Sequence, residues 1–366
     1  MSIRTQVERR IAPTQTTVRY LRTSPSSIRY LGWLGQHNLG DEAVHQALQY
    51  YLAPHELAWR PERVPGLLDS RARRGSHALT VLGGGTLIGG RYVSDFTEES
   101  DASRRAIFGS GVIDPTFPHS YRNGFEPLDR WIEAMEGIAV LGVRGPHSQQ
   151  ILADRGVDAP VLGDPVAAFV QDERHWRPVS KEAGFERVLG VNVGQSAGGM
   201  YGSELDMLKH TADTVRSYVD RGWTIEYFVV WPEDLAVTKI FARDVGTRDA
   251  AIHRIYDRAT DFLAASRHLD AFVGLKLHAV ALAACAGVPS ASIAYQPKCL
   301  DFLASLGLER LAVRSDQMSR GELARVIDEL IDDGEAISQT AIGSLGDLRD
   351  RQVEAAAVLT GLIDRP

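Results

Sequence analysis

The sequence predicts an α/β protein with two domains, each built on a parallel β-sheet covered by helices. At 366 residues the chain is longer than one hydrophobic core usually supports. Short apolar runs alternate with amphipathic runs, a pattern typical of parallel sheets. The alternation stops in a polar stretch at 173–186 and starts again at Val188. In paired sheets of this kind, ligands bind at the carboxyl ends of the strands, in the crevice between the two units.

These observations divide the chain into four parts. We expect residues 1–27 to form a basic lead-in and residues 28–175 to form the N-terminal domain. Residues 186–345 are expected to form the C-terminal domain, and 346–366 an amphipathic helix that packs near the domain junction.

The elements follow in chain order. In the N-terminal half, strands are predicted at 29–33, 77–82, 106–109, 137–142 and 161–163, with a helix that starts at Ala43. In the C-terminal half, strands are predicted at 188–194, 223–231, 270–273 and around 292. Helices are predicted at 203–221, from 235 through 243, at 250–266 and at 277–286.

Composition excludes several classes of function. The net charge of −7 argues against a nucleic-acid-binding protein. Two cysteines provide neither a disulfide framework nor a cysteine metal site, which fits the reducing cytoplasm. Since no window approaches 18 uninterrupted apolar residues, no transmembrane segment is predicted. The basic N-terminus leaves open a peripheral contact with the inner face of the membrane, although solvated arginines explain it equally well.

The strongest functional signal is the stretch that runs from Val273 to Pro289. It places Lys276 and His278 at the N-terminus of a predicted helix, directly after a buried strand. Free backbone N–H groups and the positive end of the helix dipole favour an anion there. The next strand ends in a second lysine, Lys298. The alternative is a solvated Lys276 and a His278 that only caps the helix.

Polar residues also follow strands of the N-terminal half. His37, Asn38 and Asp41 occupy the first strand-to-helix turn, where they suit a hydroxyl-rich substrate, or where Asn38 or Asp41 simply caps the helix. Arg144 follows the strand at 137–142, where its fork could bind a carboxylate or phosphate, or form a surface ion pair.

Glycines at 83–85 follow another strand and precede Thr86. Their spacing does not match a dinucleotide-binding turn. Glycines at such a place allow the backbone to approach a ligand closely, or merely turn the chain. The sequence contains no motif of a zinc metalloprotease, a P-loop nucleotide hydrolase or an α/β-hydrolase.

Six short elements, taken together and in order, resemble the polysaccharide pyruvyl transferase family. They are Gly35 to Ala43, Gly83 to Gly85, Val143-Arg144 with Ser148, Leu162-Gly163-Asp164-Pro165, Lys276-Leu277-His278 with Gly287-Val288-Pro289, and Tyr295-Gln296-Pro297-Lys298. They cover residues 31–310 approximately. One departure concerns Lys276, because the family commonly has arginine there; lysine keeps the charge but loses the bidentate fork.

The resemblance implies two Rossmann-like domains in an arrangement like that of GT-B glycosyltransferases, with the active site in the interdomain cleft. It implies an enzyme that transfers a pyruvyl group from phosphoenolpyruvate (PEP) to two hydroxyls of one sugar. PEP is the co-substrate; no other cofactor and no metal is expected. The expected partners are PEP and a sugar or glycan acceptor, either lipid-linked or soluble, in the cytoplasm.

The resemblance also assigns roles to residues. The PEP ligands are expected to be Arg144 together with four residues of the C-terminal, donor side: Lys276, Leu277, His278 and Lys298. Of these, His278, Lys276 and Arg144 are the catalytic candidates, with His278 as general acid. On the N-terminal side, the acceptor is expected near His37, Asn38, Asp41, Gly84, Gly85 and Thr86. Two alternatives remain open: a nucleotide-sugar glycosyltransferase or epimerase of the same architecture, and a non-catalytic relative that binds an anionic glycan.

Overall fold

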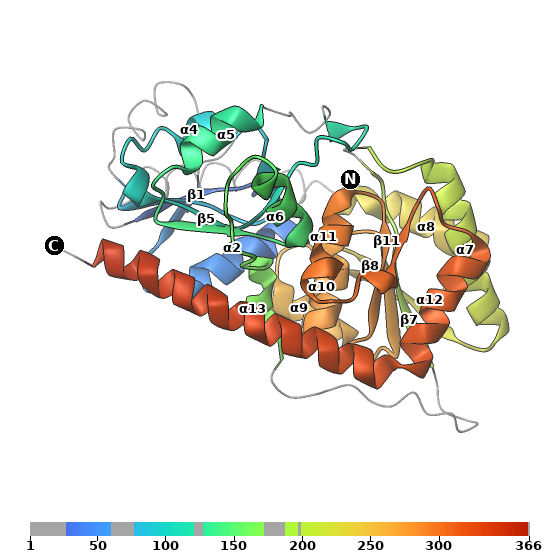
Figure 1. The fold of residues 1–366 in the computed structure, drawn as a ribbon. Coiled ribbons are helices and arrows are strands. Elements are labelled where there is room, and N and C mark those ends of the chain that lie inside the picture. The colour runs from blue at the N-terminus through green and yellow to red at the C-terminus, as the bar shows by residue number, and fades with distance from the viewer. Residues whose placement is uncertain (1–26, 60–76, 121–126, 172–186, 197–198, 365–366) are drawn as a thin grey trace, which may run out of the picture.

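The computed structural model describes residues 27–59, 77–120, 127–171, 187–196 and 199–364. Two α/β domains lie side by side, and one long helix runs along both (Figure 1). This confirms the predicted fold class. The predicted lead-in at 1–27 lies outside the described residues apart from Ser27.

The N-terminal domain contains a parallel sheet with the order β2-β1-β3-β5, in which both β4 and β6 pair with β5. Its strands are β1 (Ile28–Leu31), β2 (Leu57–Trp59), β3 (Leu79–Leu82), β4 (Thr86–Ile88), β5 (Arg105–Val112) and β6 (Val140–Val143). Its helices are α2 (Leu39–Tyr51), α4 (Val93–Phe96), α5 (Leu128–Met135) and α6 (Pro146–Ala153), with 3₁₀ turns η1 (Ala102–Arg104) and η3 (Pro165–Phe169). The predicted strand at 161–163 is reduced to one bridge, between Val161 and Val143.

The C-terminal domain contains a second parallel sheet, with the order β12-β11-β10-β7-β8-β9. Its strands are β7 (Val188–Asn192), β8 (Thr224–Val229), β9 (Ile252–Arg254), β10 (Ala271–Gly274), β11 (Ser290–Ala294) and β12 (Ala312–Arg314). Its helices are α7 (Glu204–Asp220), α8 (Leu235–Val245), α9 (Ala259–Ser266), α10 (Leu277–Cys285), α11 (Pro297–Ser305) and α12 (Arg320–Asp332), with 3₁₀ turns η4 (Pro232–Asp234) and η5 (Glu309–Leu311).

One predicted element is wrong. The segment 250–266, predicted as a single helix, contains the edge strand β9 followed by the shorter helix α9. Ile252 pairs with Tyr227 of β8, and the backbone N–H of Ile255 donates to the carbonyl of Val229. Pairing with the exposed edge of β8 therefore overrides the local helical pattern, which extends only over the second half of the segment.

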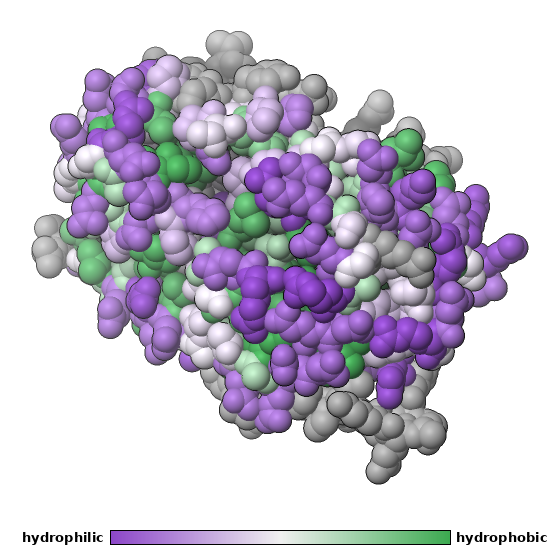
Figure 2. All heavy atoms as spheres, turned by 45° about the vertical axis from the view of Figure 1, so that its right-hand side comes forward, coloured by the Kyte–Doolittle hydropathy of each residue, from purple (hydrophilic) through white to green (hydrophobic). Residues whose placement is uncertain are grey.

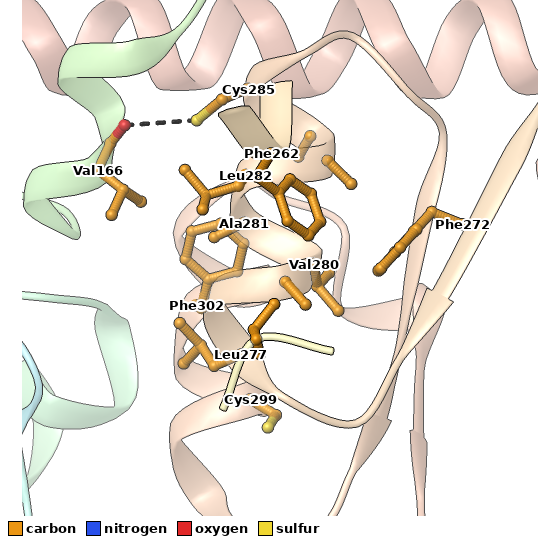
Figure 3. Packing of buried hydrophobic residues seen from close by; sticks show 14 of the residues in the cluster. Val166, Phe262, Phe272, Leu277, Val280, Ala281, Leu282, Cys285, Cys299 and Phe302 are labelled. Atoms are coloured by element: carbon orange, nitrogen blue, oxygen red, sulfur yellow. Dashed lines mark hydrogen bonds between the residues drawn. The ribbon is translucent and has the colours of Figure 1, made fainter. Parts of the chain in front are cut away.

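The helix α10 is buried on nearly all sides, which its small apolar residues permit. Phe262, Phe272 and Phe302 surround it, as Figure 3 shows. At its end the thiol of Cys285 donates a hydrogen bond to the carbonyl of Val166 in η3, 3.4 Å away. A helix with polar residues on one side would not fit here, so the core fixes the position of the two residues with which α10 starts.

The helix α13 (Gly334–Ile363) spans both domains (Figure 1). It begins earlier than the predicted segment 346–366, because buried Ile337, Ala341 and Leu345 continue the helical spacing through two glycines. On the C-terminal side, Ser338 Oγ donates to the Gly287 carbonyl at 2.7 Å. On the N-terminal side, the fully buried Gln352 amide donates to the carbonyls of Leu162 and Asp164, both at 3.0 Å. The helix thus braces the two domains against each other.

The face shown in Figure 2 is mainly hydrophilic, with hydrophobic residues in small separate areas. Within the part of the chain that the structure describes, no helix combines the length and the apolar character needed to cross a bilayer.

Candidate active site

The two domains meet where β1 and β8 end. The backbone N–H of Leu39, at the start of α2, donates to the carbonyl of Val230 at 2.9 Å. The fully buried Asn192 at the end of β7 extends this framework on the C-terminal side, since its amide donates to the Phe228 carbonyl at 2.8 Å and accepts from the Lys276 N–H at 2.8 Å. The carboxyl ends of strands from both sheets therefore form one rigid junction.

Lys276 is the N-cap residue of α10, as its sequence position predicted. Its ammonium donates to the Gln195 carbonyl at 2.7 Å, lies 3.3 Å from Asp234 Oδ2, and sits 5.1 Å from the centre of the Trp231 ring. The side chain is only 15% exposed, so Lys276 is not a solvated loop residue. Burial raises the pKa of Asp234, and the nearby Lys276 ammonium opposes that rise. Contacts with Asp234 and the Gln195 carbonyl therefore keep the Lys276 ammonium at the junction.

His278 connects the two domains. Its Nε2 lies 3.4 Å from Oδ2 of Asp164, a carboxylate of the N-terminal domain that is completely buried. Its Nδ1 lies against Gly40, where a Cβ atom would overlap the imidazole. Burial alone would raise the pKa of Asp164, but His278 and then Arg144 outweigh it and hold that pKa below its usual value. Asp164 therefore places a buried negative charge beside the His278 ring.

Asp41, in the first turn of α2, faces the same junction. Burial raises the pKa of Asp41 to about 7, although His278 and Lys298 both oppose the rise. The residue as a whole is partly exposed. A carboxyl that titrates near neutral pH beside an imidazole and an ammonium is suited to proton transfer.

We expect Asp41→Asn to stabilise the protein at neutral and alkaline pH. Because the folded-state pKa is higher than that of the unfolded chain, the wild-type protein loses stability as pH rises from about 4 through about 7. The full shift is equivalent to about 4 kcal/mol, and partial solvent access reduces the expected gain to about 2 kcal/mol at pH 8. Urea denaturation at pH 5 and pH 8 measures it. Equal pH dependence in both proteins would contradict the assignment.

Lys298 lies in the first turn of α11, with its ammonium 4.9 Å from the centre of the Tyr295 ring. Burial lowers its pKa, and the nearby Arg144 adds to that effect, while Cys299 and Asp41 oppose it. Among the described residues, no ion pair or hydrogen bond engages this ammonium. In contrast to Lys276, Lys298 is a cation without a fixed carboxylate partner.

Arg144, at the end of β6, is 1% exposed and lies between the domains. Its Nε and Nη2 donate to Asp301 Oδ2 at 3.2 and 3.1 Å, and its Nη1 donates to the Gly85 carbonyl and Thr86 Oγ1. Asp301 belongs to α11 and also accepts from the start of α6: the N–H groups of His147 and Ser148 and the Ser148 hydroxyl. The sequence left open that Arg144 forms a surface ion pair. Arg144 does form an ion pair, with Asp301, but the pair is buried.

Of the remaining candidates of the N-terminal domain, some lie at the junction and others do not. The exposed His37 has a positive φ of 53°, and its Nδ1 lies 2.8 Å from Oδ1 of Asp257 in the other domain. Asn38 caps α2 by accepting from the Gly40 N–H at 3.0 Å, as the capping alternative predicted. Gly84 packs closely against Val44 and Pro165. His37 and Asp41 are thus brought to the junction, whereas Gly84, Gly85 and Thr86 serve packing or bind Arg144.

Comparison with known proteins decides the family. The family model described as polysaccharide pyruvyl transferase matches residues 19–297, more than half of the chain. The chain belongs to the polysaccharide pyruvyl transferase family. A search of curated proteins found no significant match.

Solved structures show that this pyruvyl transferase family member has the two-domain fold that glycosyltransferases and epimerases also have. An S. aureus MnaA–UDP structure aligns with a TM-score of 0.57 at 11% identity, over 88% of this chain and 93% of that chain. A putative UDP-N-acetylglucosamine 2-epimerase from Listeria monocytogenes aligns with a TM-score of 0.53 at 14% identity, over 87% and 91% of the chains. A UDP-glucosyltransferase from Polygonum tinctorium gives 0.50 at 13% identity, over 93% and 99%. At such identities the likeness concerns the fold alone.

Sequence reasoning missed three carboxylates of this pyruvyl transferase junction: Asp164, Asp234 and Asp301. Asp164 had a signal, since it belongs to the Gly163-Asp164-Pro165 turn of the family. Asp234 and Asp301 had none, because each pairs with a cation far away in the sequence. Within the described ranges, no cluster of three or more histidine, cysteine, aspartate or glutamate residues is suited to hold a metal ion.

Proposed function

We propose that the chain transfers a pyruvyl group from PEP to two hydroxyls of one sugar, forming a pyruvate ketal on a polysaccharide, a glycolipid or a precursor of one. Family membership supports polysaccharide pyruvylation in general. The observation that carries the finer proposal is the pairing of His278 with Asp164 across the domain boundary, beside a Lys298 ammonium that has no carboxylate partner among the described residues.

PEP is a small trianion, so its site needs several donors and cations. The proposed ligands are Lys298, with no carboxylate partner in the described part of the chain, Lys276, and the backbone N–H groups of Leu277 and His278 at the start of α10. The Leu277 side chain is buried in the core, so only its backbone is available (Figure 3). Arg144 remains a proposed ligand only for a conformation in which it leaves Asp301, since its guanidinium is fully engaged here.

In the proposed reaction, protonated His278 donates a proton to the methylene carbon of PEP, and a sugar hydroxyl attacks C2 while losing its proton to Asp41. The resulting tetrahedral carbon then loses phosphate as its C2–O bond breaks. The second hydroxyl bonds to C2, and its proton leaves with phosphate. Atoms balance once Asp41 passes the first hydroxyl proton to His278, replacing the proton given to the new methyl group, while the second hydroxyl proton departs on the phosphate. Asp41 suits the role of base because its pKa is about 7.

We expect Lys298→Met to weaken PEP binding by about 1.5 to 3 kcal/mol, the usual scale for hydrogen bonds to a charged group. Titration calorimetry with PEP measures it. Lys209→Met, which removes an exposed lysine from α7, is the matched control and should leave PEP affinity unchanged. Unaltered affinity in the Lys298 variant would remove this lysine from the PEP site.

The whole proposal is tested by incubating the protein with PEP and a panel of glycosides and glycans, followed by mass spectrometry for the ketal and an assay for released phosphate. Acceptor-dependent phosphate release together with the ketal mass supports it. The nucleotide-sugar alternative has support from the fold of the UDP-binding neighbours only. Thermal stabilisation by UDP or UDP-sugars, with none by PEP, would favour that alternative and contradict the proposal.

A further inference from the structure

Two tryptophans face each other across the domain junction. Trp33 follows β1 of the N-terminal domain, and Trp231 follows β8 of the C-terminal domain. Their ring centres are 6.2 Å apart, and the ring planes meet at 69°, an edge-to-face contact. Both side chains are partly exposed. A large aromatic ring that stays partly exposed gives up some of the hydrophobic stabilisation that full burial would provide. A ligand that covers the exposed part of the two rings would recover it.

The two rings differ in what already covers them. The Lys276 ammonium occupies a face of Trp231. Trp33 makes its ring contact with Trp231, and among the described residues no cation lies over its face. Trp33 is therefore the ring of the pair that carries no cation in the described part of the chain, and Trp231 links it to Lys276 of the proposed PEP site.

Polar groups follow Trp33 in the chain. His37 lies four residues after Trp33 and pairs with Asp257, whose side chain is 65% exposed. The other oxygen of Asp257 is free of any hydrogen bond to the described residues. An accessible aromatic pair of this kind matches a pyranose ring, which has an apolar C–H face and hydroxyls around its edge. A linear polyol has the hydroxyls but no comparable flat face.

We propose that the Trp33–Trp231 pair is a platform on which a pyranose acceptor stacks, with Trp33 as the residue that selects cyclic sugars. This deepens the proposed function and depends on it, because it assumes that a sugar occupies this side of the junction. Each domain supplies one ring, so the platform is complete only while the domains are held together as they are here. The acceptor end of the site then adjoins Lys276 directly.

Saturation-transfer NMR without PEP tests the platform. The probes are methyl β-D-galactopyranoside and methyl β-D-glucopyranoside, with sorbitol as the open-chain comparison. We expect signal transfer to ring protons of at least one pyranoside, concentrated on one face, and little transfer to sorbitol. Trp33→Ala and Trp33→Leu should reduce the pyranoside signal at least fivefold, whereas Trp33→Phe should retain most of it. Tyr50→Ala removes a 68% exposed aromatic residue from the end of α2 and should change nothing.

Melting temperatures of the variants show whether they fold, and the leucine variant keeps apolar bulk if the alanine variant does not. Equal transfer to sorbitol and the pyranosides, no pyranoside signal from the wild-type protein, or an unchanged signal in the alanine and leucine variants would each overturn the platform. Because the measurement needs no turnover, it separates the two proposals: sugar stacking without ketal formation contradicts the reaction and leaves the platform intact.

Discussion

Replacing His278 with glutamine is expected to lower kcat by about 10²- to 10⁴-fold, the range for loss of a general acid, while KM for PEP changes little. The imidazole lies between the buried Asp164 and Gly40, at the junction where the substrate is proposed to bind. Steady-state kinetics with PEP and an acceptor that forms the ketal measure the effect. The fall of kcat/KM at alkaline pH should also vanish in the variant.

His253→Gln is a matched control for that experiment. Its Nε2 also pairs with a carboxylate, Glu226 at 2.7 Å, but on the edge strand β9. The control should keep kcat within about twofold. If His278 only caps α10, the variant should lose thermal stability or PEP affinity in place of kcat. Near-normal turnover with an intact alkaline limb would exclude His278 as the acid.

Replacing Asp301 with alanine is expected to destabilise the protein by about 3 to 5 kcal/mol, because it leaves the buried Arg144 guanidinium without its counter-charge. The start of α6 loses its acceptor at the same time. Urea denaturation measures the change in the free energy of unfolding. A substitution that removes both charges, Arg144→Met with Asp301→Leu, should recover a large part of the loss.

The control for this prediction is Asp213→Ala, which breaks the partly exposed pair with Arg216 and should cost less than about 1 kcal/mol. Equal losses in the two alanine variants would contradict the view that burial makes the Arg144–Asp301 pair sensitive. The outcome also bears on PEP binding. If the pair proves weak, Arg144 can leave Asp301 and reach a substrate; if it is strong, Arg144 holds the domains together.

Sequence reasoning predicted the fold well where local patterns decide it. The strand β10 and the helix α10 have nearly the predicted bounds, because apolar runs and their spacing reflect burial directly. The helix predicted at 250–266 failed since its first half pairs with β8, a strand more than twenty residues earlier. Local propensity carries no information on such partners.

The sequence also predicted which residues lie near one another at the junction. Strand-end residues His278, Lys276, Lys298 and Asp41 do gather at the junction, since parallel sheets bring such ends together. What the sequence could not show was which cation is free and which is already paired. The engagement of Arg144 and Lys276 and the availability of Lys298 depend on Asp301 and Asp234, and contacts across the two domains decide them.

The position of α13 in the chain has a consequence for how the protein is made. This helix follows both domains in sequence, yet its Gln352 supports the turn that carries Asp164. During synthesis each domain can form its own sheet as it leaves the ribosome, because domains generally fold as units. The Asp164 turn, however, gains this support only after residue 352 has emerged. A nascent chain therefore has two folded halves before the contact between Asp164 and His278 has its full support.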